Sequence, residues 1–284
     1  MKKKITLLLI LSVFFICFST LTANAKTWYV DAAAGPGGSG DSWTEAFQDI
    51  QTAIDHASSL WMQCFAPQDK IYVRAGTYNL SATIDLDKVV GIYGGFPPAG
   101  NPGMADRNWQ TYATIIDGRN LRQCISARSS YFLIDGFTIR NGDATFGAGL
   151  YAEKTPVYCS LIGYMASVVR NCTFINNEAL NGGAVYDGGA DLKITNCRFL
   201  NNHSRSAGGA IFSSYGSPQI SKCTFTGNTA VTNGGAICGY WANQTTDAVS
   251  YIFNSVFHNN SANLGGAIHS YIFYPRIWNC TIAQ

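Results

Sequence analysis

The side chains that could do chemistry in this sequence are a few aspartates and one arginine. The acids are Asp117, Asp135, Asp143, Asp187 and Asp191, and Arg140 lies among the first three. A carboxylate cluster could hold Ca²⁺ while a lysine or arginine takes a proton from a sugar ring, which would make a lyase for acidic polysaccharides. Two acids facing each other across a groove could instead hydrolyse a glycosidic bond.

These acids also fit a structural role. Asp117 and Asp135 each precede a glycine, which is a common setting for an aspartate in a turn. The chain lacks the Asn-Thr-Asp, Asp-Asp and Gly-His-Gly set of polygalacturonases, the arginine motif of pectate lyases and any CxxC metal pattern. We therefore expect no catalytic, cofactor-binding or metal-binding residues, with Ca²⁺ bound only if the lyase alternative holds.

A phrase recurs through the second half of the chain. It reads NCTFINNEALNGGAV, NCRFLNNHSRSAGGAI, KCTFTGNTAVTNGGAI and NSVFHNNSANLGGAI, and a fifth copy starts as NCTIAQ. Most steps between its phenylalanines, Phe174, Phe199, Phe225 and Phe257, are 25 or 26 residues. A fixed period of this length indicates a stack of structural units rather than one globular core.

The residue types at equivalent positions of the repeat copies predict an all-β fold. Each copy holds apolar residues in alternation, which indicates two or three half-buried strands per repeat, and each strand ends at Asn, Gly or Ser, which tolerate turns. We predict a right-handed parallel β-helix in which each repeat is one coil and equivalent strands pair at about 4.8 Å. The asparagine three residues after each Phe should form a structural ladder and take the backbone bend: Asn177, Asn202, Asn228 and Asn260.

Cysteines share one position of the repeat, two residues before the Phe or Ile. They are Cys172, Cys197, Cys223 and Cys280. Residues two apart on a strand share a face, so these thiols should point inward with the phenylalanines and behave as small buried hydrophobic groups. Disulfides between coils are geometrically possible, but we favour free thiols.

The organisation along the chain follows from composition. Residues 1–25 have the basic, apolar and small-residue parts of a secretory signal peptide, and residues 26–70 supply an N-terminal strand and a capping helix. In that helix Ser42 and Glu45 have capping-box spacing. Residues 71–284 form the β-helix, with repeats clearest from residue 134 and cut off at the C-terminus, and long loops near Gly149–Val169 and Gly239–Tyr251. We expect the chain to be a fragment of a longer protein.

The repeat resembles that of the chlamydial polymorphic outer membrane proteins, because GGA followed by Ile or Val is paired with FxxN in four copies. Residues 27–118, with TWYVD, IYVRAGTY and GIYGGF, look like the front of large surface β-helix proteins of Bacteroidetes-type bacteria, which share the pectin-lyase-like fold. The resemblance implies a β-helix that is exported to the outer membrane, cell surface or medium of a Gram-negative bacterium. It also implies adhesion and no catalytic residue.

Binding is the function that the outward positions favour. The residue after the inward Val, Ile or Leu of each glycine phrase should form an outward stripe, in which Cys238 also falls: Tyr151, Tyr186, Phe212 and His269. Such a row could stack on sugar rings or take a partner protein. His258 should face solvent, as should His269. We expect a glycan or a host or cell-surface protein as the partner, and membrane association only through parts of the protein not shown.

Two other classes stay open. A polysaccharide lyase or glycoside hydrolase would turn over acidic glycans, and a purely structural spacer would neither bind nor react. Nucleic acid is not expected as a partner, because the formal charge falls from +2 to −1 once Lys2, Lys3 and Lys4 leave with the signal peptide, and basic clusters are absent from the sequence.

Overall fold

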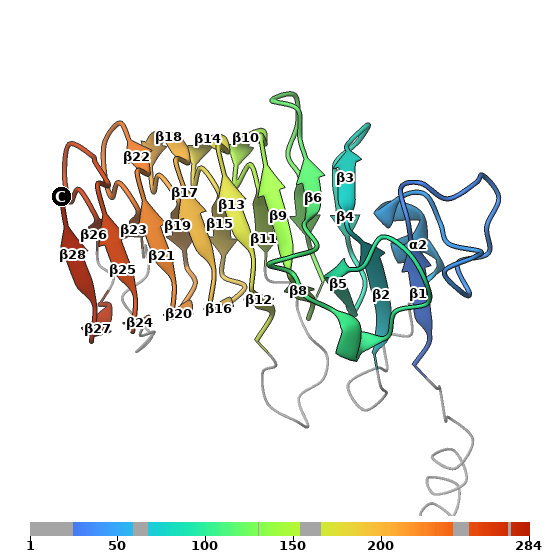
Figure 1. Cartoon of the computed structure of the whole chain (residues 1–284). Coiled ribbons are helices and arrows are strands. Elements are labelled where there is room, and N and C mark those ends of the chain that lie inside the picture. The colour runs from blue at the N-terminus through green and yellow to red at the C-terminus, as the bar shows by residue number, and fades with distance from the viewer. Residues whose placement is uncertain (1–24, 59–67, 130, 154–165, 241–249, 272–273) are drawn as a thin grey trace, which may run out of the picture.

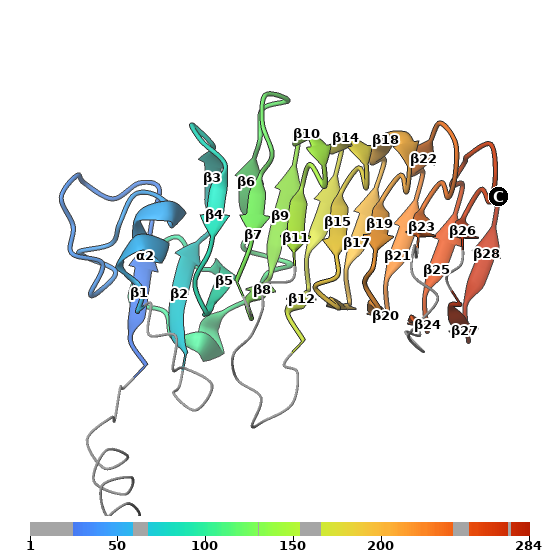
Figure 2. The same cartoon turned by 180° about the vertical axis from the view of Figure 1, so that it is seen from behind.

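The protein is a right-handed parallel β-helix whose coils stack from β1 at one end to β28 at the other (Figures 1 and 2). The computed structural model describes residues 25–58, 68–129, 131–153, 166–240, 250–271 and 274–284. The predicted signal peptide falls almost wholly outside these residues, as do 154–165 and 241–249 of the predicted long loops. Each central coil runs through four sheets in turn, here called sheets I to IV, and continues into sheet I of the next coil.

All strand pairs are parallel and connect one coil with the next. Sheet I contains β1 (Thr27–Val30), β2 (Asp69–Arg74), β5 (Val90–Phe96), β8 (Leu133–Asp135), β12 (Val168–Arg170), β16 (Lys193–Thr195), β20 (Gln219–Ser221), β24 (Tyr251–Phe253) and β27 (Arg276–Trp278). Sheet II contains β3 (Gly76–Asn79), β6 (Thr114–Asp117), β9 (Phe137–Arg140), β13 (Thr173–Ile175), β17 (Arg198–Leu200), β21 (Thr224–Thr226), β25 (Val256–His258) and β28 (Thr281–Ala283).

The other two sheets complete the coil. Sheet III contains β10 (Asp143–Phe146), β14 (Glu178–Asn181), β18 (His203–Ala207) and β22 (Thr229–Ala230). Sheet IV contains β4 (Ile84–Leu86), β7 (Ile125–Ala127), β11 (Leu150–Glu153), β15 (Val185–Gly188), β19 (Ile211–Ser214), β23 (Ile237–Tyr240) and β26 (Ile268–Tyr271). The repeat therefore holds four strands in the central coils, so the prediction of two or three was wrong. Sheet III was missed because its strands are short and largely polar, as in HSRSA.

The core consists of ladders of identical side chains inside the coils. Phe174, Phe199, Phe225 and Phe257 stack with ring centroids 5.1, 4.7 and 4.7 Å apart and rings within 4° of parallel. Each is fully buried, as is each of the residues Ile194, Ile220 and Ile252 of sheet I. Because each coil contributes one residue to each position, every core side chain packs against the equivalent residue of the coils before and after it.

The asparagine ladder lies inside the coil at the corner between sheets II and III. The Oδ1 of Asn202 accepts from the backbone N and Nδ2 of Asn177 at 3.1 and 3.0 Å, and its own Nδ2 donates to the carbonyl of Phe174 at 3.0 Å. Asn228 and Asn260 repeat this pattern. Buried amide groups therefore satisfy one another along the stack.

The backbone bend at that corner falls one residue earlier than predicted. Left-handed conformations occur at Asn176 (φ 54°), Asn201 (φ 52°) and Asn259 (φ 53°), with Gly227 (φ 65°) in the third copy. The ladder asparagines are not among the residues with positive φ. Adjacent residues therefore form the ladder and the bend, because the buried amide of one must point inward while the backbone of the other reverses the chain.

The two glycines of each pair, at the corner between sheets III and IV, are required for different reasons. The first of each pair is left-handed, as Gly208 is with φ 70°, which only Gly adopts without cost. A Cβ on the second, Gly209, would overlap the carbonyl oxygen of Gly235 in the next coil. The pair is thus required both by backbone conformation and by the close approach of successive coils.

A short helix, α2 (Ile50–His56), packs against β1, β2 and β4 at the N-terminal end of the stack. Its N-cap is Asp49, whose Oδ1 accepts from the backbone N of Thr52 at 2.8 Å. The N-terminal helix is confirmed, but the predicted capping box is wrong, since Ser42 and Glu45 form a turn before the helix. A 3₁₀ turn, η1 (Met104–Asp106), follows β5.

The repeat cysteines lie in the core. Cys172, Cys197 and Cys223 are each 1% exposed, and the described cysteines, including Cys124, Cys238 and Cys280, are free thiols. Burial, together with the neighbouring thiols, raises the pKa of Cys197 well above its ordinary value. A neutral, buried thiol is a small hydrophobic group, as the sequence predicts. Cys64 and Cys159 fall outside the described residues.

Candidate ligand-binding face

The outer face of sheet IV carries a stack of aromatic side chains. Tyr151, Tyr186 and Phe212 are register partners on β11, β15 and β19. Their ring centroids are 5.4 and 5.6 Å apart, with rings tilted by 11° and 13°. Alternation along each strand sends Leu150, Val185 and Ile211 into the core and these rings outward. All three rings are half-buried, so one side of each stays open to solvent.

The aromatic stack stops at the next coil. Cys238 takes the position of Phe212 on β23 and is only 3% exposed, and His269 follows on β26. The Cys238 Sγ lies 4.0 Å from the His269 Nδ1. Burial raises the pKa of the Cys238 thiol to about 12, so it stays protonated at neutral pH. The structure therefore places Cys238 on the floor of the outer face instead of in an outward stripe, while His269 points outward as predicted.

Three further aromatic residues on this face were not predicted. Phe146 lies 4.9 Å from Tyr186, and Tyr240 stacks on Tyr271 at 5.3 Å. Phe146 is 38% exposed, Tyr240 39% and Tyr271 53%. Tyr240 and Tyr271 lie two residues after Cys238 and His269 and so share their face, which is the sequence signal that could have found them.

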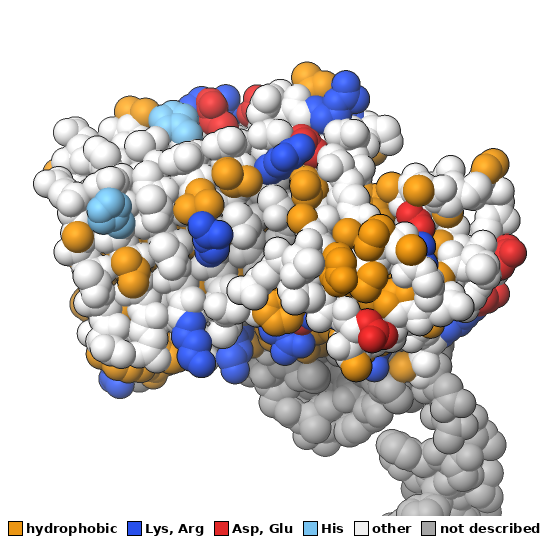
Figure 3. All heavy atoms as spheres, viewed as in Figure 1, with side chains coloured by type: hydrophobic (Ala, Val, Ile, Leu, Met, Phe, Trp, Pro, Cys, Tyr) orange, Lys and Arg blue, Asp and Glu red, His pale blue; other side chains and the backbone are white. Residues whose placement is uncertain are grey.

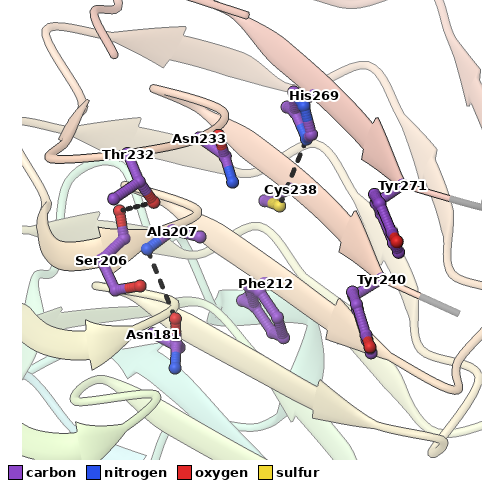
Figure 4. A pocket seen from close by; sticks show the side chains of 10 residues that line it. All are labelled: Asn181, Ser206, Ala207, Phe212, Thr232, Asn233, Cys238, Tyr240, His269 and Tyr271. Atoms are coloured by element: carbon purple, nitrogen blue, oxygen red, sulfur yellow. Dashed lines mark hydrogen bonds between the residues drawn. The ribbon is translucent and has the colours of Figure 1, made fainter. Parts of the chain in front are cut away.

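A hollow of about 390 Å³ lies where the stack is interrupted (Figure 4). Phe212 and His269 border it along the column, and Tyr240 and Tyr271 border it on one side. Polar residues of sheet III and of the corner before sheet IV form the opposite border: Asn181, Ser206, Thr232 and Asn233. Cys238 is smaller than the rings at this position in the coils before it, so no ring stands between Phe212 and His269 here.

The face carries little charge. Among the residues that the structure describes, the ten that line the hollow include no acid, lysine or arginine. Burial, with a smaller contribution from Glu153, raises the pKa of Tyr151 to about 12, so its hydroxyl is neutral. Arg128 lies 5.7 Å from the Tyr151 ring and 4.0 Å from Glu153, so this cation has an acid beside it.

A second aromatic cluster covers the first coils of sheet I, where hydrophobic side chains gather on the surface (Figure 3). Tyr29, Tyr72 and Tyr93 meet edge to face at 5.9 Å. Arg107 lies over Tyr93 and also over Trp109, and burial raises the pKa of Tyr72 and Tyr93. These rings therefore fix the segment after β5 to the sheet, which is a packing role.

The five candidate catalytic acids do not form one cluster, although Asp187 and Asp191 lie near each other. Asp135 is 1% exposed and pairs with Arg107 at 2.7 Å and Arg170 at 2.8 Å. Asp117 pairs with Arg140 at 2.7 Å and accepts from the backbone N of Arg119 at 2.9 Å.

The remaining acids are spread over sheets III and IV. Asp143 on β10 lies 3.4 Å from Arg205 at the surface. Asp187 on β15 is fully buried, and Asp191 accepts from the backbone N of Ser217 at 2.8 Å. The structure brings Asp117, Asp135 and Asp143 to arginines and does not gather the five acids into one groove.

The described residues contain neither a candidate metal site nor a candidate membrane-spanning helix. No three His, Cys, Asp or Glu side chains among them are placed to hold a metal ion. No helix in the described part of the chain has the length and apolar character needed to span a membrane.

Comparison with protein families gives one match, to the Chlamydia polymorphic membrane protein (Chlamydia_PMP) repeat, at residues 196–214, 222–240 and 254–271. Three segments of this chain match that repeat. Comparison with curated proteins and with solved structures gave no match. The resemblance stated from the GGA and FxxN pattern is therefore confirmed, and the repeat indicates a protein of the outer membrane or cell surface.

Each matched repeat corresponds to the same part of a coil. The matches begin at the left-handed corner after sheet I, at Asn196, Lys222 or Asn254. They end with the last residue of a sheet IV strand, at Ser214, Tyr240 or Tyr271. The polymorphic membrane protein repeat thus runs through sheets II and III and ends on the aromatic face.

Proposed function

We propose that this protein is a cell-surface or secreted β-helix that acts as an adhesin or passenger domain, binds a glycan or a partner surface, and catalyses no reaction of its own. The observation that supports this function is the stack of Tyr151, Tyr186 and Phe212 on the outer face of sheet IV. The outer edges of these stacked, half-buried rings form an apolar strip that suits contact with a sugar or a protein surface, since aromatic side chains supply a large contact area at low entropic cost.

The different roles of inward, corner and outward residues of the repeat also support a binding function. The phenylalanines, the asparagine ladder and the paired glycines are used in packing, hydrogen bonding and turns. Outward residues of sheet IV carry no such constraint, and several of them are large and apolar. This division of roles leaves the outward residues of sheet IV available for binding, which supports the proposal.

Replacement of both Tyr186 and Phe212 by Ala tests the proposal. The double variant should stay folded with a melting temperature lowered by only several degrees, because the removed rings lie outside the core but pack on their neighbours. It should lose at least about tenfold in glycan or host-surface binding. The measurement is retention on a glycan array beside the wild-type chain. Unchanged retention would exclude this face as the binding surface.

The competing function is a polysaccharide lyase or glycoside hydrolase that acts on acidic glycans. That activity needs an ionisable acid or base facing a groove, whereas Asp117 and Asp135 are engaged with arginines. An assay for unsaturated or reducing sugar ends, with and without Ca²⁺, separates the two classes. Turnover would overturn the binding proposal in its present form.

A further inference from the structure

The hollow at Cys238 has walls of two chemical kinds. Aromatic faces border it at Phe212, Tyr240 and Tyr271. The corner between sheets III and IV borders it with side-chain amides and hydroxyls (Figure 4). Such a site offers apolar contact on one side and hydrogen-bond donors and acceptors on the other.

The polar border keeps part of its hydrogen-bonding capacity free. Asn181 uses its Oδ1 to accept from the backbone N of Ala207 at 3.3 Å, which leaves the two donors of its Nδ2. The Thr232 hydroxyl donates to the carbonyl of Ser206 at 2.9 Å and can still accept. In the described part of the chain the Asn233 amide has no hydrogen-bond partner, so it can both donate and accept.

The size and charge of the hollow restrict its occupant. A volume of about 390 Å³ is near the low end of the roughly 300–1,000 Å³ typical of small-molecule sites, so it suits a ligand of one or two rings. An acidic sugar would bring a negative charge to a site whose described lining residues include neither lysine nor arginine. Hydroxyl-rich neutral rings match both the amide border and the aromatic border.

We propose that the hollow between Phe212, Cys238 and His269 is a subsite that takes one uncharged sugar ring of a surface glycan. The inference rests on the proposed binding function and adds the class of ligand and the point where it is held. The rest of the glycan then extends along Phe212, Tyr186 and Tyr151. The interruption of the aromatic stack at Cys238 therefore determines where on the face the sugar ring binds.

A larger side chain at Cys238, a buried position on the floor of the hollow, tests the proposal. Cys238→Phe places a ring between Phe212 and His269 and closes the space, whereas Cys238→Ser keeps a side chain of similar size and leaves it open. The probes are arrays of neutral, sialylated and sulfated oligosaccharides, applied to the full chain. We expect wild type to bind neutral glycans, Cys238→Phe to lose at least about tenfold, and Cys238→Ser to stay within about twofold.

Two results would overturn the subsite. One is equal binding by Cys238→Phe and wild type, and the other is a wild-type preference for sialylated or sulfated glycans over neutral ones. If the Tyr186→Ala and Phe212→Ala pair weakens binding while Cys238→Phe does not, the face binds glycan but the hollow is not its subsite. If neither change affects retention, both proposals fail. If wild type binds no glycan, the subsite fails, whereas binding to a partner protein surface is left as the proposed function. Equal melting temperatures for the two Cys238 variants control for folding.

Discussion

Asp187 carries a carboxyl group that the fold buries completely. Its Oδ1 accepts from the backbone N of Ala190 at 2.8 Å, while its Oδ2 has no partner in the described part of the chain. Its register partner in the next coil is Ser213, a neutral residue. Burial, together with Asp191 nearby, raises the pKa of Asp187 to about 7. The fold therefore favours the protonated form.

This carboxyl group makes stability depend on pH in a defined direction. Between about pH 4 and pH 7 the native state keeps a proton that the unfolded chain releases, so the free energy of unfolding falls as pH rises. The loss amounts to up to about 4 kcal/mol above pH 7. Asp187→Asn should remove this slope and be more stable than wild type at pH 8.

Urea unfolding at pH 5 and pH 8 measures the effect. Asp143→Asn is the matched control, since it removes the same charge from an exposed position. An Asp187→Asn variant with the pH dependence of wild type would show that the carboxyl group is ionised in the folded protein.

At this scale the sequence predicted some positions and missed others. Tyr151, Tyr186, Phe212 and His269 were found because alternation beside a glycine phrase assigns their direction. The burial of Cys238 and the stacking of Tyr240 on Tyr271 could not be predicted, since both depend on which side chain the neighbouring coil places beside each position.

Among the elements, the asparagine ladder makes the strongest claim about stability. Asn202→Ala removes an acceptor for two donors of Asn177 and a donor to the Phe174 carbonyl, all of them buried. Each polar group left without a partner costs about 1–3 kcal/mol. We expect a total loss of about 3 kcal/mol in the free energy of unfolding.

Asn196→Gly is the matched control for the ladder. Asn196 lies in an exposed corner with φ 55°, which Gly adopts freely, and its Nδ2 donates to Asn171 Oδ1 at 2.8 Å. Its replacement should cost less than about 1 kcal/mol in the same denaturant titration. Equal losses for the two variants would mean that the buried ladder contributes no more than a surface contact.

Element boundaries were harder to predict than element types. The apolar face of Ala46, Phe47, Ile50, Ala53 and Ile54 is buried throughout, so periodicity located the segment correctly. The helix covers only its second part, because the Asp49 carboxylate caps the backbone N of Thr52 and the earlier residues belong to turns. Periodicity reports burial, and a cap depends on local geometry that several nearby Ser, Thr or Asp residues could supply.

For the whole molecule, the period of the sequence was enough to predict a parallel β-helix. One residue type per coil in each column produces the phenylalanine, isoleucine, cysteine and asparagine ladders without any long-range information. Surface function was less predictable, because it depends on adjacent outward columns of sheet IV that a single repeat does not reveal. The hollow exists only where Phe212, Cys238 and His269 meet in three successive coils.

The central claim is that the outer face of sheet IV binds ligand and that the other faces of the coil do not. Sheet II offers a matched control, because Ile175 and Leu200 are register partners in the same two coils as Tyr186 and Phe212 and are also half-buried and outward. Around them the later coils present a mostly polar surface with scattered hydrophobic side chains (Figure 3).

The decisive measurement is the dissociation constant of the full chain for the array glycan that wild type binds most tightly. The Tyr186→Ala and Phe212→Ala pair should raise it at least about tenfold, and the Ile175→Ala and Leu200→Ala pair should leave it within about twofold of wild type. Equal weakening by both pairs, or weakening by the sheet II pair alone, would contradict the account.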